Sequence, residues 1–115
     1  AMNPVIDRHE WAEDTERWHG EIQLGKRGAN VSVIFFDRAE PGGGPKLHRH
    51  PYPETFIIRA GRVLFILGDR EILAEAGQIV VVPANAPHKF TNPGPGPLQT
   101  IDIHENGSFI TEWLE

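Results

Sequence analysis

The stretch GGGPKLHRHPYPETFIIRAG, residues 42–61, contains the features that decide the fold and the chemistry of this chain. Glycine and proline open it and a glycine closes it, as is typical of a short strand between turns. His48 and His50 are separated by one residue, and Glu54 follows a Pro-Tyr-Pro kink. Residues i and i+2 of a strand lie on one face, about 6.6–7 Å apart. Two imidazoles at that spacing can converge on one metal ion, and Glu54 shares their parity if the strand resumes after the kink.

A His-x-His pair alone is weak evidence for a metal site, because two surface histidines in a strand are the commoner explanation. A second stretch, GQIVVVPANAPHKFTN at residues 77–92, bears on the choice. It reads as an apolar strand closed by Pro83, a turn, and another short strand that begins with His88. Pro87 fixes the chain that enters this last strand.

Together, the two stretches resemble the two signature segments of the cupin superfamily. The first segment is carried by Gly42, His48, His50, Glu54 and Gly61, and the second by Gly77, Pro83, Asn85, His88 and Asn92. The family usually has glycine where this chain has Asn85. Asparagine tolerates a left-handed backbone better than other non-glycine residues, so we expect this turn to survive.

The resemblance implies an all-β double-stranded β-helix, the cupin jelly-roll barrel, with one metal ion inside. The family's ligands carry over onto His48, His50, Glu54 and His88, and each position holds the expected residue type. Three imidazoles and one carboxylate suit a divalent transition metal. We expect Mn, Fe, Ni or Zn, with Mn or Fe favoured, bound less tightly as the histidines protonate near about pH 6. The alternative is a barrel whose site is empty or vestigial.

The rest of the chain fits a barrel of about nine short strands joined by tight turns. Its 115 residues are enough for one domain, and 12 glycines and 10 prolines favour turns over long helices. We predict an N-terminal arm over residues 1–19 and a single barrel domain over residues 20–115. Minor helical turns are expected at the two ends, within 7–18 and 109–114. Strands are expected from Gly20 and over 30–37, 47–50, 54–59, 62–67, 71–75, 78–82, 87–92 and 98–104.

Charge and composition exclude several partners. The net charge of −5 without a basic stripe argues against nucleic acid and against an anionic membrane surface. The absence of cysteine removes disulfides, thiolate metal sites and thiol nucleophiles. No apolar run approaches the length of a membrane span, and no signal-peptide pattern is visible, so we expect a cytoplasmic protein.

Strand parity predicts what surrounds the metal. Residues that share the face of the ligands are expected to line a largely apolar pocket: Phe56, Ile58, Phe90 and Asn92, with Asn92 as a polar contact or a turn anchor. On the last long strand, Thr100, Asp102 and His104 form one polar face. A solvent-facing stripe is the favoured interpretation of that face, and a histidine that assists the metal is the alternative. His104 and Tyr52, which could gate the site, are the candidate catalytic residues. His9 and His19 are expected at the surface.

The expected function is that of a small mononuclear metal-dependent enzyme of the dioxygenase, decarboxylase or isomerase type. Four protein ligands would leave two positions of an octahedral metal ion open. A small organic acid, a diketone or a related bidentate substrate could bind at these two positions. A phosphosugar would require basic residues inside, and the inward positions offer none apart from the histidines, which slightly favours an organic acid or aromatic substrate. The alternative is a non-catalytic metal-dependent binding or sensor module, because a fold does not settle a function.

The outer surface predicts a homodimer. Ile57, Leu64 and Ile66 are expected to point outward from two strands of one hairpin and to form an apolar patch. A twofold pairing would bury such a patch against its own copy. The arm, through Trp11 and Trp18, is expected to cover the patch in its own subunit or to cross to a neighbour.

Overall fold

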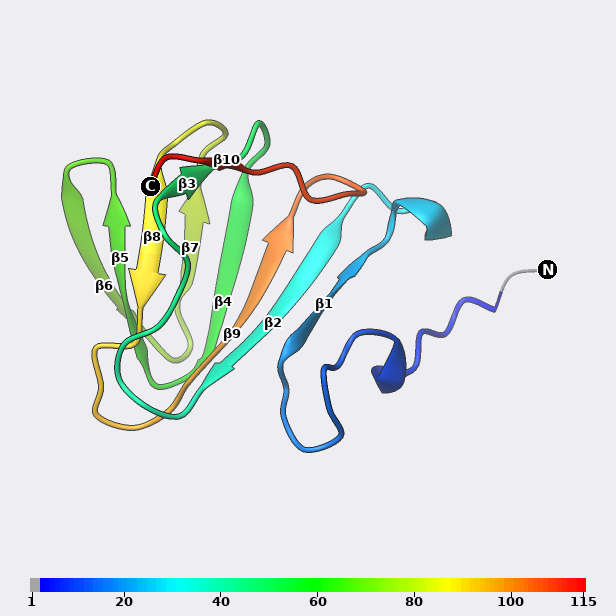
Figure 1. Cartoon of the computed structure of the whole chain (residues 1–115), viewed down its shortest axis with the longest axis horizontal. Coiled ribbons are helices and arrows are strands. Elements are labelled where there is room, and N and C mark those ends of the chain that lie inside the picture. The colour runs from blue at the N-terminus through cyan, green and yellow to red at the C-terminus, as the bar shows by residue number, and fades with distance from the viewer. Residues whose placement is uncertain (1–2) are drawn as a thin grey trace.

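Ten short strands form two five-stranded antiparallel sheets that face one another in this computed structural model, which describes residues 3–115 (Figure 1). The first sheet has the order β1 (Gly20–Gln23), β2 (Ser32–Arg38), β9 (Leu98–His104), β4 (Glu54–Ala60) and β7 (Ile79–Val82). The second has the order β10 (Glu112–Trp113), β3 (His48–Arg49), β8 (His88–Thr91), β5 (Arg62–Leu67) and β6 (Arg70–Glu75). Two 3₁₀ turns, η1 (Arg8–Glu10) and η2 (Gly25–Arg27), complete the elements. The all-β prediction is confirmed.

The hydrophobic core lies between the two sheets. Burial alternates along β4, so Phe56 and Ile58 point inward and their neighbours point outward. Phe56 packs edge-on against Phe65 of β5, with ring centroids 4.8 Å apart, and both contact Phe90 of β8. This cluster joins the two sheets, and it leaves the end of the barrel near β3 and β10 for the polar residues described below (Figure 1).

β4 and β5 do not form a hairpin within one sheet, which corrects the prediction of a shared outer patch. The chain passes from one sheet to the other at Gly61, whose φ is +74°. A Cβ there would lie 2.1 Å from the Pro97 carbonyl oxygen, so only glycine fits this close crossing. Ile57 therefore faces outward from one sheet, while Leu64 and Ile66 belong to the other.

The N-terminal arm packs on the outer face of its own first sheet. Trp11 stacks on Phe35 of β2 with ring centroids 3.9 Å apart, and Trp18 lies 5.2 Å from Trp11. The guanidinium of Arg59 sits over the Trp18 ring. The arm forms one helical turn, η1, and Figure 1 shows it beside β1.

The expected helical turn at the C-terminal end is wrong. Residues 112 and 113 instead form β10, in which Glu112 pairs with Arg49 and Trp113 with His48. Arg49 also forms an ion pair with Glu112 at 2.7 Å. The short strand β3 would otherwise have an unpaired edge here, and pairing this edge outweighs the helical spacing of the apolar residues.

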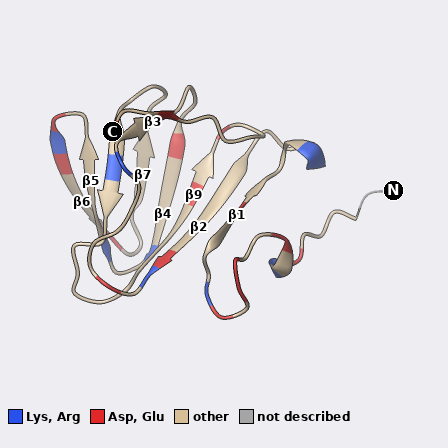
Figure 2. Cartoon of the chain, in the orientation of Figure 1, with Lys and Arg blue, Asp and Glu red and all other residues tan. Residues whose placement is uncertain are grey.

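Charged residues sit mostly at strand ends and loops, without a basic stripe (Figure 2). Acidic positions interrupt β4 and β9, the two central strands of the first sheet (Figure 2). Among the described residues, no helix has the length and hydropathy of a membrane span.

Candidate metal centre

Four side chains converge at one end of the barrel, and they come from both sheets. His48 of β3, His50 just after it, Glu54 at the start of β4 and His88 at the start of β8 each offer one ligand atom. These atoms lie within 4.8 Å of one another, and all four residues are buried. Cross-strand pairing of His48 with His88 brings two of the imidazoles together. The structure thus assembles the four residues that sequence analysis selected as metal ligands.

Backbone carbonyls fix the orientation of the three imidazoles. The Nδ1 atoms of His48, His50 and His88 lie 2.7, 2.8 and 2.9 Å from the carbonyl oxygens of Lys46, Ile110 and Ala86. Because a carbonyl only accepts, each Nδ1 carries the proton and donates it. Each Nε2 then presents its lone pair to the centre of the cluster, as metal-bound histidines do.

The donor set fits a divalent ion. The buried Nε2 of His50 has no hydrogen-bond partner of suitable geometry among the described residues, although it lies 3.2 Å from a Glu54 oxygen. A buried polar atom without a partner is costly, and a metal ion would satisfy it. Nitrogen and carboxylate donors without sulfur suit Mn, Fe, Ni or Zn.

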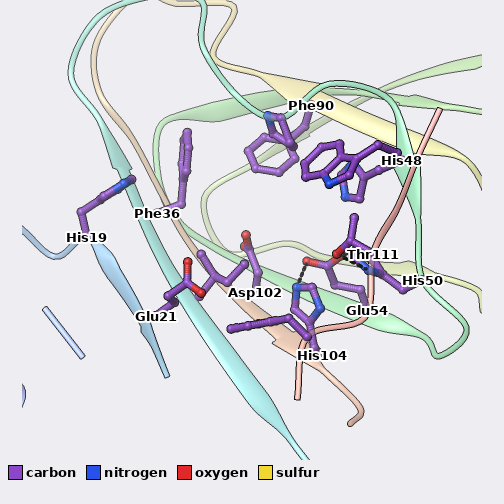
Figure 3. A pocket seen from close by; sticks show the side chains of 14 residues that line it. His19, Glu21, Phe36, His48, His50, Glu54, Phe90, Asp102, His104 and Thr111 are labelled. Carbon is purple, nitrogen blue, oxygen red and sulfur yellow. Dashed lines mark hydrogen bonds and ion pairs between the residues drawn. The ribbon is translucent and has the colours of Figure 1, made fainter. Parts of the chain in front are cut away.

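Glu54 is at the centre of these contacts. Its Oε1 lies 3.2 Å from His50 Nε2 and 3.1 Å from His88 Nε2, and its Oε2 lies 2.9 Å from His104 Nε2 (Figure 3). Burial opposes ionisation of this carboxyl, but contact with His104, the largest of the contacts that favour the charged form, holds its pKa well below the ordinary value. Glu54 is therefore a carboxylate at neutral pH.

His104 belongs to this cluster in the opposite tautomer. The Tyr52 hydroxyl accepts a hydrogen bond from the Ile110 N–H and lies 2.7 Å from His104 Nδ1. Since Nδ1 of His50 already donates to a carbonyl, the hydroxyl proton goes to His104 Nδ1. The His104 proton then sits on Nε2, directed at the Glu54 carboxylate. His104 thus orients a ligand and is not itself set up as one.

The prediction of a solvent-facing stripe on β9 is wrong. Thr100, Asp102 and His104 are 2–3% exposed, because β9 is the middle strand of its sheet and this face points into the barrel. The Thr100 hydroxyl donates to the Asp102 carboxyl at 2.6 Å. Burial, followed by the charge of Glu54, raises the pKa of Asp102 well above its ordinary value.

The cluster opens into a cavity of about 390 Å³. Of the predicted site residues, the cavity is lined by His48, His50, Glu54, Phe90 and His104, whereas His88 is not among its lining residues. Phe56 and Ile58 point inward but lie in the core. Asn92 is a turn anchor that binds backbone groups of Glu40, Gly94 and Gly96. Phe56 and Ile58 were therefore wrongly expected in the pocket wall, whereas Asn92 takes the second of its two expected roles, that of a turn anchor.

Tyr52 is buried and does not line this cavity, so the structure gives it a positioning role behind His104 in place of the expected gating role. His19 lies at the cavity and is half-buried, with its Nδ1 accepting the Asp37 N–H, which corrects its assignment to the surface. His9 is exposed as expected.

Sequence reasoning missed several cavity walls. They come from strands β1 and β2, from the loop before β3 and from the C-terminal segment: Glu21, Ile34, Phe36, Pro45, Phe109, Thr111 and Trp113. The parity of β9, shared by Asp102 and His104, was the one signal that pointed to Asp102. The remaining walls depend on how distant segments pair, which spacing within one strand does not encode.

Acid is expected to destabilise the metal-free protein through His48. Burial lowers the pKa of His48 from 6.5 to about 4, so between these values the unfolded chain binds more protons than the folded one. This contribution to stability is full above about pH 6.5 and is lost as the pH falls toward about 4. The free energy of unfolding should drop by about 1–2 kcal/mol between about pH 7 and 5, measured by urea titration with a chelator present. The same titration of His48→Gln should show a flatter pH slope, and an equal slope would contradict this assignment.

Comparisons with known proteins agree with this architecture. Residues 35–104 match a protein-family model described as a cupin domain. A mannose-1-phosphate guanylyltransferase of Escherichia coli O157:H7 is 31% identical over 74 residues, which is 64% of this chain and 15% of that protein. The chain thus spans about one sixth of the length of the curated relatives it matches.

Two solved structures show the same fold. A Klebsiella pneumoniae protein with a double-stranded β-helix domain has a TM-score of 0.74 at 18% identity, over 99% of both chains. Bacillus subtilis oxalate decarboxylase, a protein with Mn(II) centres, has a TM-score of 0.75 at 21% identity, over 92% of this chain and 30% of that one. The two sheets described above are therefore a double-stranded β-helix.

Proposed function

Because the chain belongs to the cupin family, we propose that it binds one divalent transition metal through His48, His50, Glu54 and His88 and acts as a small mononuclear metal-dependent enzyme. The proposed reaction is of the dioxygenase, decarboxylase or isomerase type, on a small bidentate substrate such as an organic acid or a diketone. Mn or Fe is the proposed metal. The Mn(II) centres of a structural neighbour support Mn, and the nitrogen and oxygen donors suit both ions.

One observation carries this proposal. The three histidines donate their Nδ1 protons to backbone carbonyls, which leaves their Nε2 atoms free to bind a metal, and the four ligand atoms lie within 4.8 Å of one another. A cluster that served only packing would gain nothing from three identical tautomers around a carboxylate. A bound divalent ion would supply a Lewis acid at this position.

The residues of the chain prepare the site in distinct ways. His104, backed by Tyr52, holds the second oxygen of Glu54 and so fixes the direction of its first oxygen. The aromatic walls limit the access of water to the cluster. Asp102 lies at the cavity surface, and the Thr100 hydroxyl donates to its carboxyl.

Metal analysis followed by assays tests the proposed function. The purified protein should contain about one Mn or Fe per chain, or take up one equivalent after loading. Loaded protein should then turn over at least one compound in a panel of diketones, catechols and small acids, followed by oxygen uptake and product analysis. Tight metal binding without turnover, together with ligand-induced thermal stabilisation, would instead indicate a binding or sensor module. A protein that takes up no metal would contradict both.

Replacing His104 separates its role from that of the ligands. His104→Gln should keep one metal per chain while turnover of any substrate found falls by about 10–100-fold, the range typical of a lost partner that orients a metal ligand. The metal content, measured by mass spectrometry, and the pH profile of kcat both check this. His9→Gln, at an exposed position, is the control and should match the wild type. Unchanged kinetics in His104→Gln would contradict a functional role.

We further propose that the protein pairs through the outer face of its first sheet. Cross-strand registers align two apolar rows there, and the arm covers the end near Phe35. The rows are Ile79–Ile57–Ile101–Phe35 and Val81–Thr55–Ile103–Val33. Ile79 and Val81, on the edge strand β7, are 62% and 59% exposed, and a twofold pairing would bury them.

Light scattering coupled to gel filtration at micromolar concentration should give a mass near twice the 12.9 kDa of the chain. Ile79→Lys should reduce it toward one chain. Leu73→Lys is the matched control, because Leu73 is also exposed but lies on the other sheet. A mass of one chain for the wild type would contradict the dimer.

A further inference from the structure

The charge of the cavity wall constrains what the site can bind. Among the described residues, no lysine or arginine lines the cavity, whereas Glu21, Glu54 and Asp102 do. A divalent ion beside the Glu54 carboxylate would leave one net positive charge. A singly charged ligand neutralises that charge, and a dianion exceeds it with no basic side chain to receive the excess.

Most of the other wall residues are apolar, although the polar His19 and Thr111 also line the cavity. The apolar walls come mainly from strands β2 and β8 and from the C-terminal segment: Ile34, Phe36, Phe90, Phe109 and Trp113. Figure 3 shows Phe36 and Phe90 on the side of the cavity away from His104. A ligand that reaches the cluster therefore has to place its carbon skeleton against these rings. A highly charged ligand would lose its hydration shell there, and the apolar walls offer no hydrogen bonds to replace it.

Asp102 supplies a polar contact inside this apolar wall. One of its oxygens accepts the Thr100 hydroxyl at 2.6 Å, and its other oxygen has no partner among residues 3–115. Figure 3 shows the carboxyl pointing into the cavity between Phe36 and Glu54. Burial, followed by the charge of Glu54, raises the pKa of Asp102, and a protonated carboxyl in this position can donate a hydrogen bond into the cavity.

We propose that the cavity takes a singly charged chelating ligand with an apolar body, such as the enolate of a 1,3-dicarbonyl compound, and that Asp102 donates a hydrogen bond to it. This inference rests on the proposed metal site. It narrows the substrate class to monoanions and excludes small dianions such as oxalate.

The wild-type protein loaded with one equivalent of Mn(II) tests the ligand class. Isothermal titration with acetylacetone and with oxalate gives two affinities, and the same two are measured for free Mn(II) in the same buffer. We expect the protein to shift the preference toward acetylacetone by at least tenfold relative to free Mn(II). An unchanged ratio, or a shift toward oxalate, would overturn the inference while leaving the metal site intact. A protein that binds no Mn(II) would overturn the proposed function and this inference together.

Two variants test Asp102, each with its Mn(II) content measured first. Asp102→Asn keeps a donor, so the affinity for acetylacetone should stay within threefold and that for oxalate should not change. A tenfold gain for oxalate would show that Asp102 is ionised and would overturn its role as a donor. Asp102→Ala should bind acetylacetone at least tenfold more weakly, and wild-type affinity in this variant would also overturn the role. Glu71→Gln, which removes an exposed charge on β6 outside the cavity, is the control and should keep wild-type affinity for acetylacetone.

Discussion

His50→Ala is expected to leave the protein without stoichiometric metal. The substitution removes one of three Nε2 donors that converge on the Glu54 carboxylate. It also removes the contact of its Nδ1 with the Ile110 carbonyl, which holds the C-terminal segment over the site. The loss of one ligand from a four-residue set lowers the affinity for metal by orders of magnitude, so less than about a tenth of an equivalent should remain after gel filtration.

Mass spectrometry of metal per chain measures this result. His9→Ala removes an exposed histidine and should keep full metal content, which controls for loss of a surface-bound ion. A circular-dichroism spectrum like that of the wild type would show that the barrel persists, because the core residues lie away from the substitution. Full metal content in His50→Ala would refute the proposed ligand set.

Gly44→Ala is expected to unfold much of the protein. Gly44 has a φ of +91°, and an ideal Cβ there would lie 1.9 Å from the carbonyl oxygen of Phe90. The left-handed backbone at this position disfavours any Cβ. The added Cβ would also collide with the Phe90 carbonyl, which is backbone and cannot move aside as the end of a flexible side chain can. The two effects together should cost about 3–5 kcal/mol of the free energy of unfolding, measured by urea titration.

Gly77→Ala separates the two effects. Gly77 has an almost identical φ of +92°, but nothing lies within 4 Å of the position of its Cβ. This variant should lose only the cost of the left-handed backbone, about 1–2 kcal/mol. If the two variants lost equal stability, the close approach between Gly44 and Phe90 would not be the cause.

The ligand cluster was predictable because local spacing defines it. His48, His50 and Glu54 lie within seven residues, and strand parity together with one proline kink places them on one face. Glycines and prolines likewise marked most strand boundaries. The resemblance to the family supplied His88, whose distance along the sequence gives no geometric information.

The support around Glu54 was not predictable because it depends on long-range register. His104 meets Glu54 only because β9 pairs with β4 in the register that sets these two residues opposite each other. A shift of one residue would turn His104 and Asp102 outward and make the polar face the solvent-facing stripe that was expected. The change of sheet at Gly61 could not be predicted for a similar reason. An Ala-Gly turn between two strands has the same local sequence pattern in a hairpin within one sheet and in a connection between two sheets.

The origin of the four ligand residues in two separate layers has a mechanical consequence. Glu54 belongs to the first sheet, while His48 and His88 belong to the second. An ion held by all of them would therefore cross-link the two sheets at the end of the barrel near β3 and β10, here called the rim. The core beneath the rim is already closed by Phe56 and Phe65. Loss of the ion would therefore loosen one end of the molecule and leave the other end closed, and amide exchange would accelerate at the rim before it does in the core.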